Sequence, residues 1–130
     1  MVVAIIGRRP ARSRRTAAIS SGSWSWSIIE LATGETRSIE WLDESVYGLA
    51  EQSVQPWITL CYGNPLYDSG YRLGAPVFTD EPTMQAWLKY VEALVNRYKD
   101  VVQEYEIWNE PENPPMWTGT REQYFELYRT

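Results

Sequence analysis

The chain has 130 residues, of which 44% are hydrophobic and 22% are charged, and its net charge is −5. It has no histidine and one cysteine, which excludes imidazole-based triads, histidine-ligated metal centres, internal disulfides and cages of several thiolates. Any hydrolytic chemistry must therefore use carboxylates, tyrosines, lysines or a metal held by carboxylates. The length fits one ordinary domain, but only about half of an eight-stranded α/β barrel, which takes ~250 residues.

The N-terminal segment is basic, whereas the remainder is acidic. Five arginines lie between Arg8 and Arg15, and the first acidic residue is Glu30. We interpret residues 1–23 as an Arg/Ser-rich segment that is disordered or not native to the domain, although the apolar run Val2 to Ile6 equally fits a short buried strand. Nucleic-acid or membrane binding is disfavoured, because no aromatic residue interleaves the arginines and the acidic remainder repels phosphate. The apolar run is too short to span a membrane, and the sequence leaves the compartment open.

After residue 38 the sequence alternates between helical and strand-like patterns. Apolar residues at steps of three and four predict an amphipathic helix over about Glu40 to Ser53. The run VQPWITLC, Val54 to Cys61, predicts a short buried strand. A loop rich in Gly, Pro, Asn and Asp follows from Tyr62 to Pro82, and its aromatic residues argue against disorder.

The same alternation then repeats. An apolar stripe at helical spacing predicts a helix over about Glu81 to Lys99, and VVQEYEIW, Val101 to Trp108, predicts a second buried strand. Thr120 is the expected N-cap of a last helix with the sequence REQYFELYRT. This βαβα series implies parallel strands with helical crossovers, and hence an α/β fold that is either a doubly wound sheet or an α/β barrel.

Functional residues of parallel α/β folds gather where the strands end. The first predicted strand ends at Tyr62-Gly63-Asn64 and the second at Trp108-Asn109-Glu110-Pro111-Glu112. The second end has an acid beside an amide, with Trp108 and Trp117 on either side in the sequence. A carboxyl that indole rings shield from water tends to stay protonated, which suits a general acid. Because tryptophan faces also suit sugar rings, the pattern indicates half of a glycosidase site.

Several motifs resemble one enzyme family. RYKDVVQEYEIWNEPE, Arg97 to Glu112, resembles the fourth-strand segment of the clan A glycoside hydrolases, which are retaining enzymes built on a (β/α)8 barrel. PWITLCYGNPLY, Pro56 to Tyr67, resembles the third strand and its loop in the family 39, xylosidase-like branch, and SIIELATGETRSIEWLD, Ser27 to Asp43, resembles the segment after strand two. The resemblance implies that residues 24–130 form a partial (β/α)8 TIM barrel, roughly strands three and four with flanking helices.

The resemblance also implies roles for individual residues. Glu110 would be the acid/base and Asn109 the ligand of the sugar 2-hydroxyl, while Tyr62, Asn64 and Trp117 are weaker candidates for lining the sugar site. Retaining hydrolysis needs a second carboxylate about 5 to 5.5 Å from the first. The family takes this nucleophile from strand seven, and no acidic residue of this sequence matches it.

The expected function takes the missing nucleophile into account. We expect a fragment, inactive by itself, of an enzyme that hydrolyses β-linked oligosaccharides or polysaccharides without a metal or other cofactor. The partner would be a carbohydrate substrate, and the oligomeric state is left open. The alternative is a non-catalytic carbohydrate-binding or interaction protein that keeps an aromatic cleft.

Other conspicuous residues have expected structural roles. Glu106 shares side-chain parity with Glu110 along the strand, so we expect it to point into the barrel and pair with a base. The Arg/Ser-rich stretch before Ser27, where the barrel family has its first two strands, lacks the character of a buried strand. The residues expected to be core are Trp57, Cys61, Trp87, Tyr90 and Tyr98.

Overall fold

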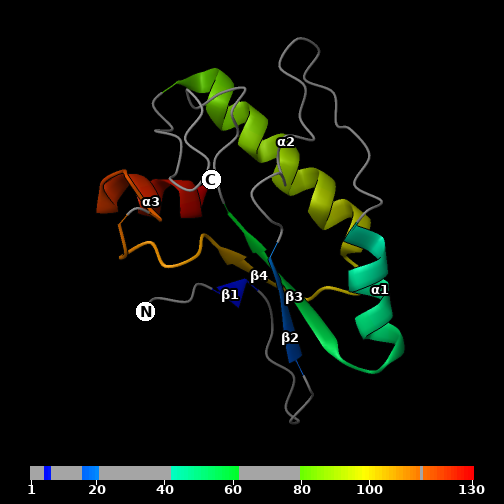
Figure 1. Cartoon of the computed structure of the whole chain (residues 1–130). Coiled ribbons are helices and arrows are strands. Elements are labelled where there is room, and N and C mark those ends of the chain that lie inside the picture. Colours follow the sequence, from blue (N-terminus) through cyan, green and yellow to red (C-terminus); the bar gives the residue numbers. More distant parts are fainter. Residues whose placement is uncertain (1–4, 7–15, 21–41, 62–79, 115) are drawn as a thin grey trace.

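The computed structural model of the chain describes residues 5–6, 16–20, 42–61, 80–114 and 116–130 (Figure 1). The elements in these ranges are β1 (Ile5–Ile6), β2 (Thr16–Ser20), α1 (Asp43–Glu51), β3 (Gln55–Leu60), α2 (Glu81–Tyr98), β4 (Glu104–Ile107) and α3 (Arg121–Arg129). Two of the candidate sugar-site residues, Tyr62 and Asn64, lie outside the described residues.

The strands form one four-stranded sheet in the order β1-β4-β3-β2. β3 is parallel to both β2 and β4, whereas the two residues of β1 pair with β4 in the antiparallel sense. The parallel pairing of β3 with β4, joined through α2, confirms the predicted βαβ unit. An open sheet of this size is compatible with a partial barrel and with a doubly wound sheet, so the barrel stays a prediction.

β2 corrects the expectation that the Arg/Ser-rich stretch before Ser27 holds no strand, whereas β1 lies in the run Val2 to Ile6, where a short strand was the alternative. Its five residues pair with β3 from Thr16 opposite Gln55 to Ser20 opposite Thr59. The sequence TAAIS has a single large apolar residue, and neighbouring arginines and serines dominate the composition around it. Strand formation depends on pairing and same-face neighbours more than on intrinsic preference, so this strand carries little signal of its own. The domain boundary at residue 23 stays a prediction.

The helices begin and end where local chemistry favours it. The Asp80 side chain caps α2 by accepting a hydrogen bond of 2.8 Å from the backbone N–H of Thr83. Thr120 and Gln123 form a complete capping box at the start of α3, which confirms Thr120 as an N-cap. α1 is shorter than predicted, and Ser53 follows it in the left-handed region with φ 59°.

The hydrophobic core lies between the helices and one face of the sheet. Burial alternates along β4, where Tyr105 and Ile107 are buried and Glu104 and Glu106 are half-buried. The largest buried helical side chains come from α2, and the core expectations for Trp87, Tyr90, Tyr98 and Cys61 are confirmed. Trp57 is only half-buried, because it lies opposite Glu104 in the register of β3 with β4 and so belongs to the face away from this core.

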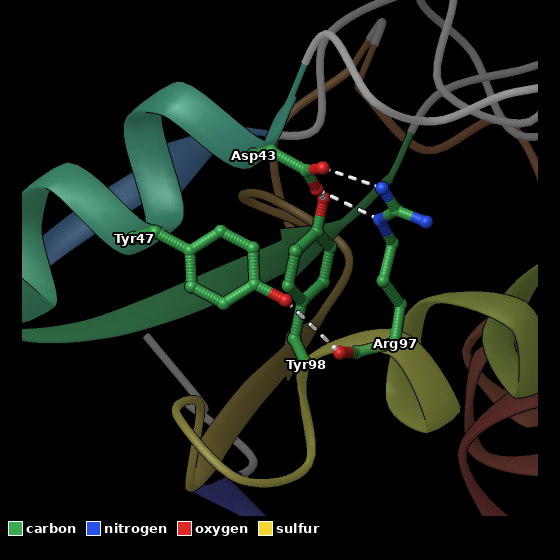
Figure 2. Close-up of polar contacts among 4 residues, drawn as sticks. All are labelled: Asp43, Tyr47, Arg97 and Tyr98. Carbon is green, nitrogen blue, oxygen red and sulfur yellow. Dashed lines mark hydrogen bonds and ion pairs between the residues drawn. The ribbon is translucent and has the colours of Figure 1, made fainter.

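A polar cluster joins the start of α1 to the end of α2 (Figure 2). The guanidinium of Arg97 donates to both carboxylate oxygens of Asp43, with 2.7 Å from Nε to Oδ1. The Tyr98 hydroxyl donates to the same Oδ1 at 2.8 Å, and the Tyr47 hydroxyl donates to the Arg97 carbonyl oxygen at 3.4 Å. The hydrogen bond from Arg97 lowers the pKa of Asp43, while burial raises the pKa of Tyr98. The four groups are one another's hydrogen-bond partners and tie the start of α1 to the end of α2, so we call them a structural clamp.

Candidate active site

The C-terminal ends of β3 and β4 lie side by side. The backbone N–H of Trp108 donates to the carbonyl oxygen of Leu60 at 2.8 Å, which continues the ladder one step past β4. The chain then turns sharply, since Trp108 (φ 66°) and Glu110 (φ 47°) both adopt left-handed backbone conformations. Such conformations are uncommon for residues other than glycine and cluster at functional sites. The turn presents Asn109 and Glu110 at the edge where parallel α/β folds carry their chemistry.

Glu110 is exposed, and a residue that the sequence analysis did not single out holds it. Its Oε2 accepts a hydrogen bond of 3.0 Å from Nδ2 of Asn113, whose backbone N–H also donates to the Glu110 carbonyl oxygen at 2.9 Å. The available signal was the spacing of an amide three residues after the acid, because asparagine commonly bonds to nearby groups in turns. Asn109, by contrast, is half-buried.

The expectation that indole rings shield Glu110 from water is wrong. Trp108 is 1% exposed, and its ring packs 6.0 Å from that of Trp87 and 5.3 Å from that of Trp117, between centroids. Its N–H donates to the Met116 carbonyl oxygen at 2.6 Å. The left-handed turn therefore sends the ring into the core and leaves the carboxyl outside. The buried tryptophans hold the loop that carries Glu110 instead of covering the carboxyl.

Trp117, expected to contact sugar, is mostly a packing residue. It is 7% exposed, and its ring meets that of Tyr124 edge-on at 5.7 Å. Its N–H donates to the Thr120 carbonyl oxygen at 2.9 Å, which links the loop to the start of α3. The remaining exposed part of Trp117 lines a pocket that contains neither Asn109 nor Glu110.

Glu106 has a different partner from the expected base. Its Oε2 accepts a hydrogen bond of 2.8 Å from the hydroxyl of Thr59, the residue directly opposite on β3. Tyr124 lies close by and donates to the Ile107 carbonyl oxygen at 3.0 Å. Burial raises the pKa of Tyr124, and the negative charge of Glu106 raises it further. Glu106 thus links β4 to β3, and its hydrogen-bond partner is the neutral hydroxyl of Thr59.

The described ranges contain no cluster of three or more acidic or cysteine side chains that could hold a metal ion. No helix in the same ranges is long and apolar enough to cross a membrane. Comparisons of the chain with protein-family models, curated proteins and solved structures find no match. The resemblance to clan A glycoside hydrolases therefore rests on the sequence motifs alone.

Proposed function

We propose that Glu110 is the acid/base carboxyl of a retaining glycosidase that acts on β-linked oligosaccharides or polysaccharides. The observation that carries the proposal is the placement of Asn109 and Glu110, directly after β4 and beside the end of β3, on a turn with two left-handed residues. Because Glu110 is exposed, its carboxyl can reach the glycosidic oxygen of a bound sugar. This arrangement agrees with the WNEP motif.

The reaction would proceed in two steps. Glu110 gives its proton to the departing glycosidic oxygen while a second carboxylate attacks the anomeric carbon and forms a covalent glycosyl intermediate. Glu110 then removes a proton from water, which attacks the same carbon and releases the second carboxylate. The family takes the second carboxylate from strand seven, and because no acidic residue of this sequence matches it, the proposal assigns that role to no residue of this sequence.

The buried rings give the proposed site its rigidity. Trp108 is fixed by its ring contacts and by its hydrogen bond to Met116, while the Asn113 amide donates to the carboxylate of Glu110. Such support matters because a proton donor must lie within hydrogen-bond reach of the oxygen it serves. On binding sugar, Glu110 would exchange the Asn113 amide for the glycosidic oxygen.

The test is turnover of aryl β-xylosides, β-glucosides and β-galactosides by the intact reading frame. We expect Glu110→Gln to lower turnover of substrates with poor leaving groups by about 10²- to 10⁴-fold, which is the usual contribution of acid–base catalysis. Glu126→Gln is the control, since Glu126 is an exposed acid on α3, outside the loop that carries Glu110. Full activity of the Glu110 variant on a poor leaving group would refute the assignment.

A non-catalytic carbohydrate-binding protein is the second candidate. The exposed Glu110 already has a protein partner in Asn113, an arrangement that also suits a loop with a purely structural role. That candidate predicts saturable sugar binding with no turnover of any glycoside by the intact reading frame. The same assays, followed by a binding titration, separate the two functions.

A further inference from the structure

A pocket of about 390 Å³ lies between the loop that follows β4 and helix α3. In Figure 1 this loop is orange and α3 is red. The volume is within the range of small-molecule sites, about 300–1,000 Å³. The lining residues are Pro111, Glu112, Pro114, Trp117, Gly119, Arg121, Tyr124 and Phe125.

The aromatic side chains that line the pocket are already held in place by the protein. Trp117 and Tyr124 pack edge-on, and each has its polar atom bound to a backbone carbonyl oxygen, Thr120 for the indole and Ile107 for the hydroxyl. They consequently offer ring surface to the pocket and need no rearrangement. Gly119 approaches the Trp117 ring so closely that an added Cβ would lie 3.1 Å from it. The backbone itself thus closes one side of the pocket.

The charged part of the lining is not paired within the protein. Arg121 and Glu112 are both exposed, and in the described ranges no ion pair or side-chain hydrogen bond joins either of them to another residue. The Arg121 guanidinium lies 5.3 Å from the centre of the Phe125 ring, which orients it by a cation–π contact. Asp43 and Arg97, in contrast, neutralise each other. The pocket therefore keeps one donor-rich and one acceptor side chain available to a ligand.

We propose that this pocket binds a neutral sugar ring, independently of Glu110. Apolar C–H faces of the ring would pack against the aromatic and proline walls, as in other sites that combine apolar walls with a few placed polar groups. The Arg121 guanidinium would donate to ring hydroxyls, and the Glu112 carboxylate would accept from them. Since the two charges balance, an uncharged ligand suits the pocket better than a carboxylate or an ammonium.

The inference goes beyond the proposed function, because no bond is broken in this pocket and Glu110 does not line it. In a glycosidase, such a pocket would hold a second part of a polymer near the cleavage site. In a non-catalytic protein, it would be the binding site itself. The pocket and the catalytic assignment can therefore fail separately.

The test is titration of the 130-residue chain with xylobiose and cellobiose, followed by calorimetry and by tryptophan fluorescence. Loss of a hydrogen bond from a charged group costs roughly tenfold in affinity, so we expect Arg121→Gln and Glu112→Gln each to weaken binding about tenfold. The matched control is Arg129→Gln, at the far end of the same helix, which should bind as the parent does.

Three results would overturn the inference. They are the absence of saturable binding by the parent chain, equal weakening by Arg129→Gln and Arg121→Gln, and a preference for glucuronic acid over the neutral sugars. Circular dichroism of each variant must match that of the parent, and Arg121→Lys, which keeps the charge, provides a second variant with an expected intermediate affinity. Absence of turnover by the intact reading frame would refute only the catalytic proposal. Absence of saturable disaccharide binding by the 130-residue chain would refute only the proposal that the pocket binds sugar.

Discussion

Replacement of Trp108 by phenylalanine tests whether the buried indole supports the loop that carries Glu110. The side chain is 1% exposed, packs against Trp87 and Trp117, and donates to the Met116 carbonyl oxygen at 2.6 Å. Phenylalanine keeps an aromatic ring but loses that hydrogen bond, worth about 0.5–1.5 kcal/mol, and leaves space where the second ring was. Together these losses should lower the free energy of unfolding by about 2–4 kcal/mol.

The assay is urea denaturation followed by circular dichroism, where a lower midpoint at constant slope reports a loss of stability. Tyr47→Phe is the control, because Tyr47 is 38% exposed and the hydrogen bond from its hydroxyl is long, at 3.4 Å; its effect should stay within ~0.5 kcal/mol. Hydrogen exchange should also accelerate at the backbone amides of Asn113 and Met116, which are bonded inside the loop. Equal midpoints for the Trp108 variant and the parent would contradict this account of the loop.

Two further substitutions probe the groups with shifted pKa values. Burial raises the pKa of Tyr105 to about 12, and its hydroxyl has no hydrogen-bond partner in the described ranges. Tyr105→Phe should therefore be neutral or stabilising by up to about 1 kcal/mol in urea denaturation. It should also abolish the share of Tyr105 in the loss of stability that the parent shows as pH rises from about 10 to 12. A destabilised variant would reveal a missing hydrogen-bond partner of the Tyr105 hydroxyl. The hydrogen bond from Arg97 lowers the pKa of Asp43 in the folded protein. The stabilisation that the Asp43 carboxylate contributes is therefore fully present above its pKa in the unfolded chain, near 3.9, and is lost as pH falls through its pKa in the folded protein. Asp43→Asn should thus reduce thermal stability at pH 7 more than at pH 2, and an equal reduction at both pH values would speak against the clamp with Arg97.

Much of the helical and strand pattern was predictable because its signals are local. The stripe of apolar residues and the Asp80 cap define α2 within one residue of the predicted bounds, and Thr120 marks the start of α3. β2 was missed because a short run of small residues becomes a strand only through pairing with β3, which is a tertiary effect.

The geometry of the candidate site was less predictable than its location. The WNEP motif placed Glu110 correctly at the end of β4, but strand alternation puts Trp108 on the same face as Glu106, away from the core. Left-handed conformations at Trp108 and Glu110 break that alternation. The sequence does not predict these conformations, because neither residue is glycine. The same turn explains why Asn113 reaches the carboxylate while the indoles do not.

The most direct measurement for the catalytic proposal is azide rescue of Glu110→Ala in the intact reading frame. Without the carboxylate, the glycosyl intermediate should form from substrates with good leaving groups and then wait for a nucleophile that needs no general base. Azide should attack the anomeric carbon, release the second carboxylate, restore turnover and yield a β-glycosyl azide. An α-glycosyl azide would make Glu110 the nucleophile, and full turnover without azide would show that Glu110 has no part in the chemistry.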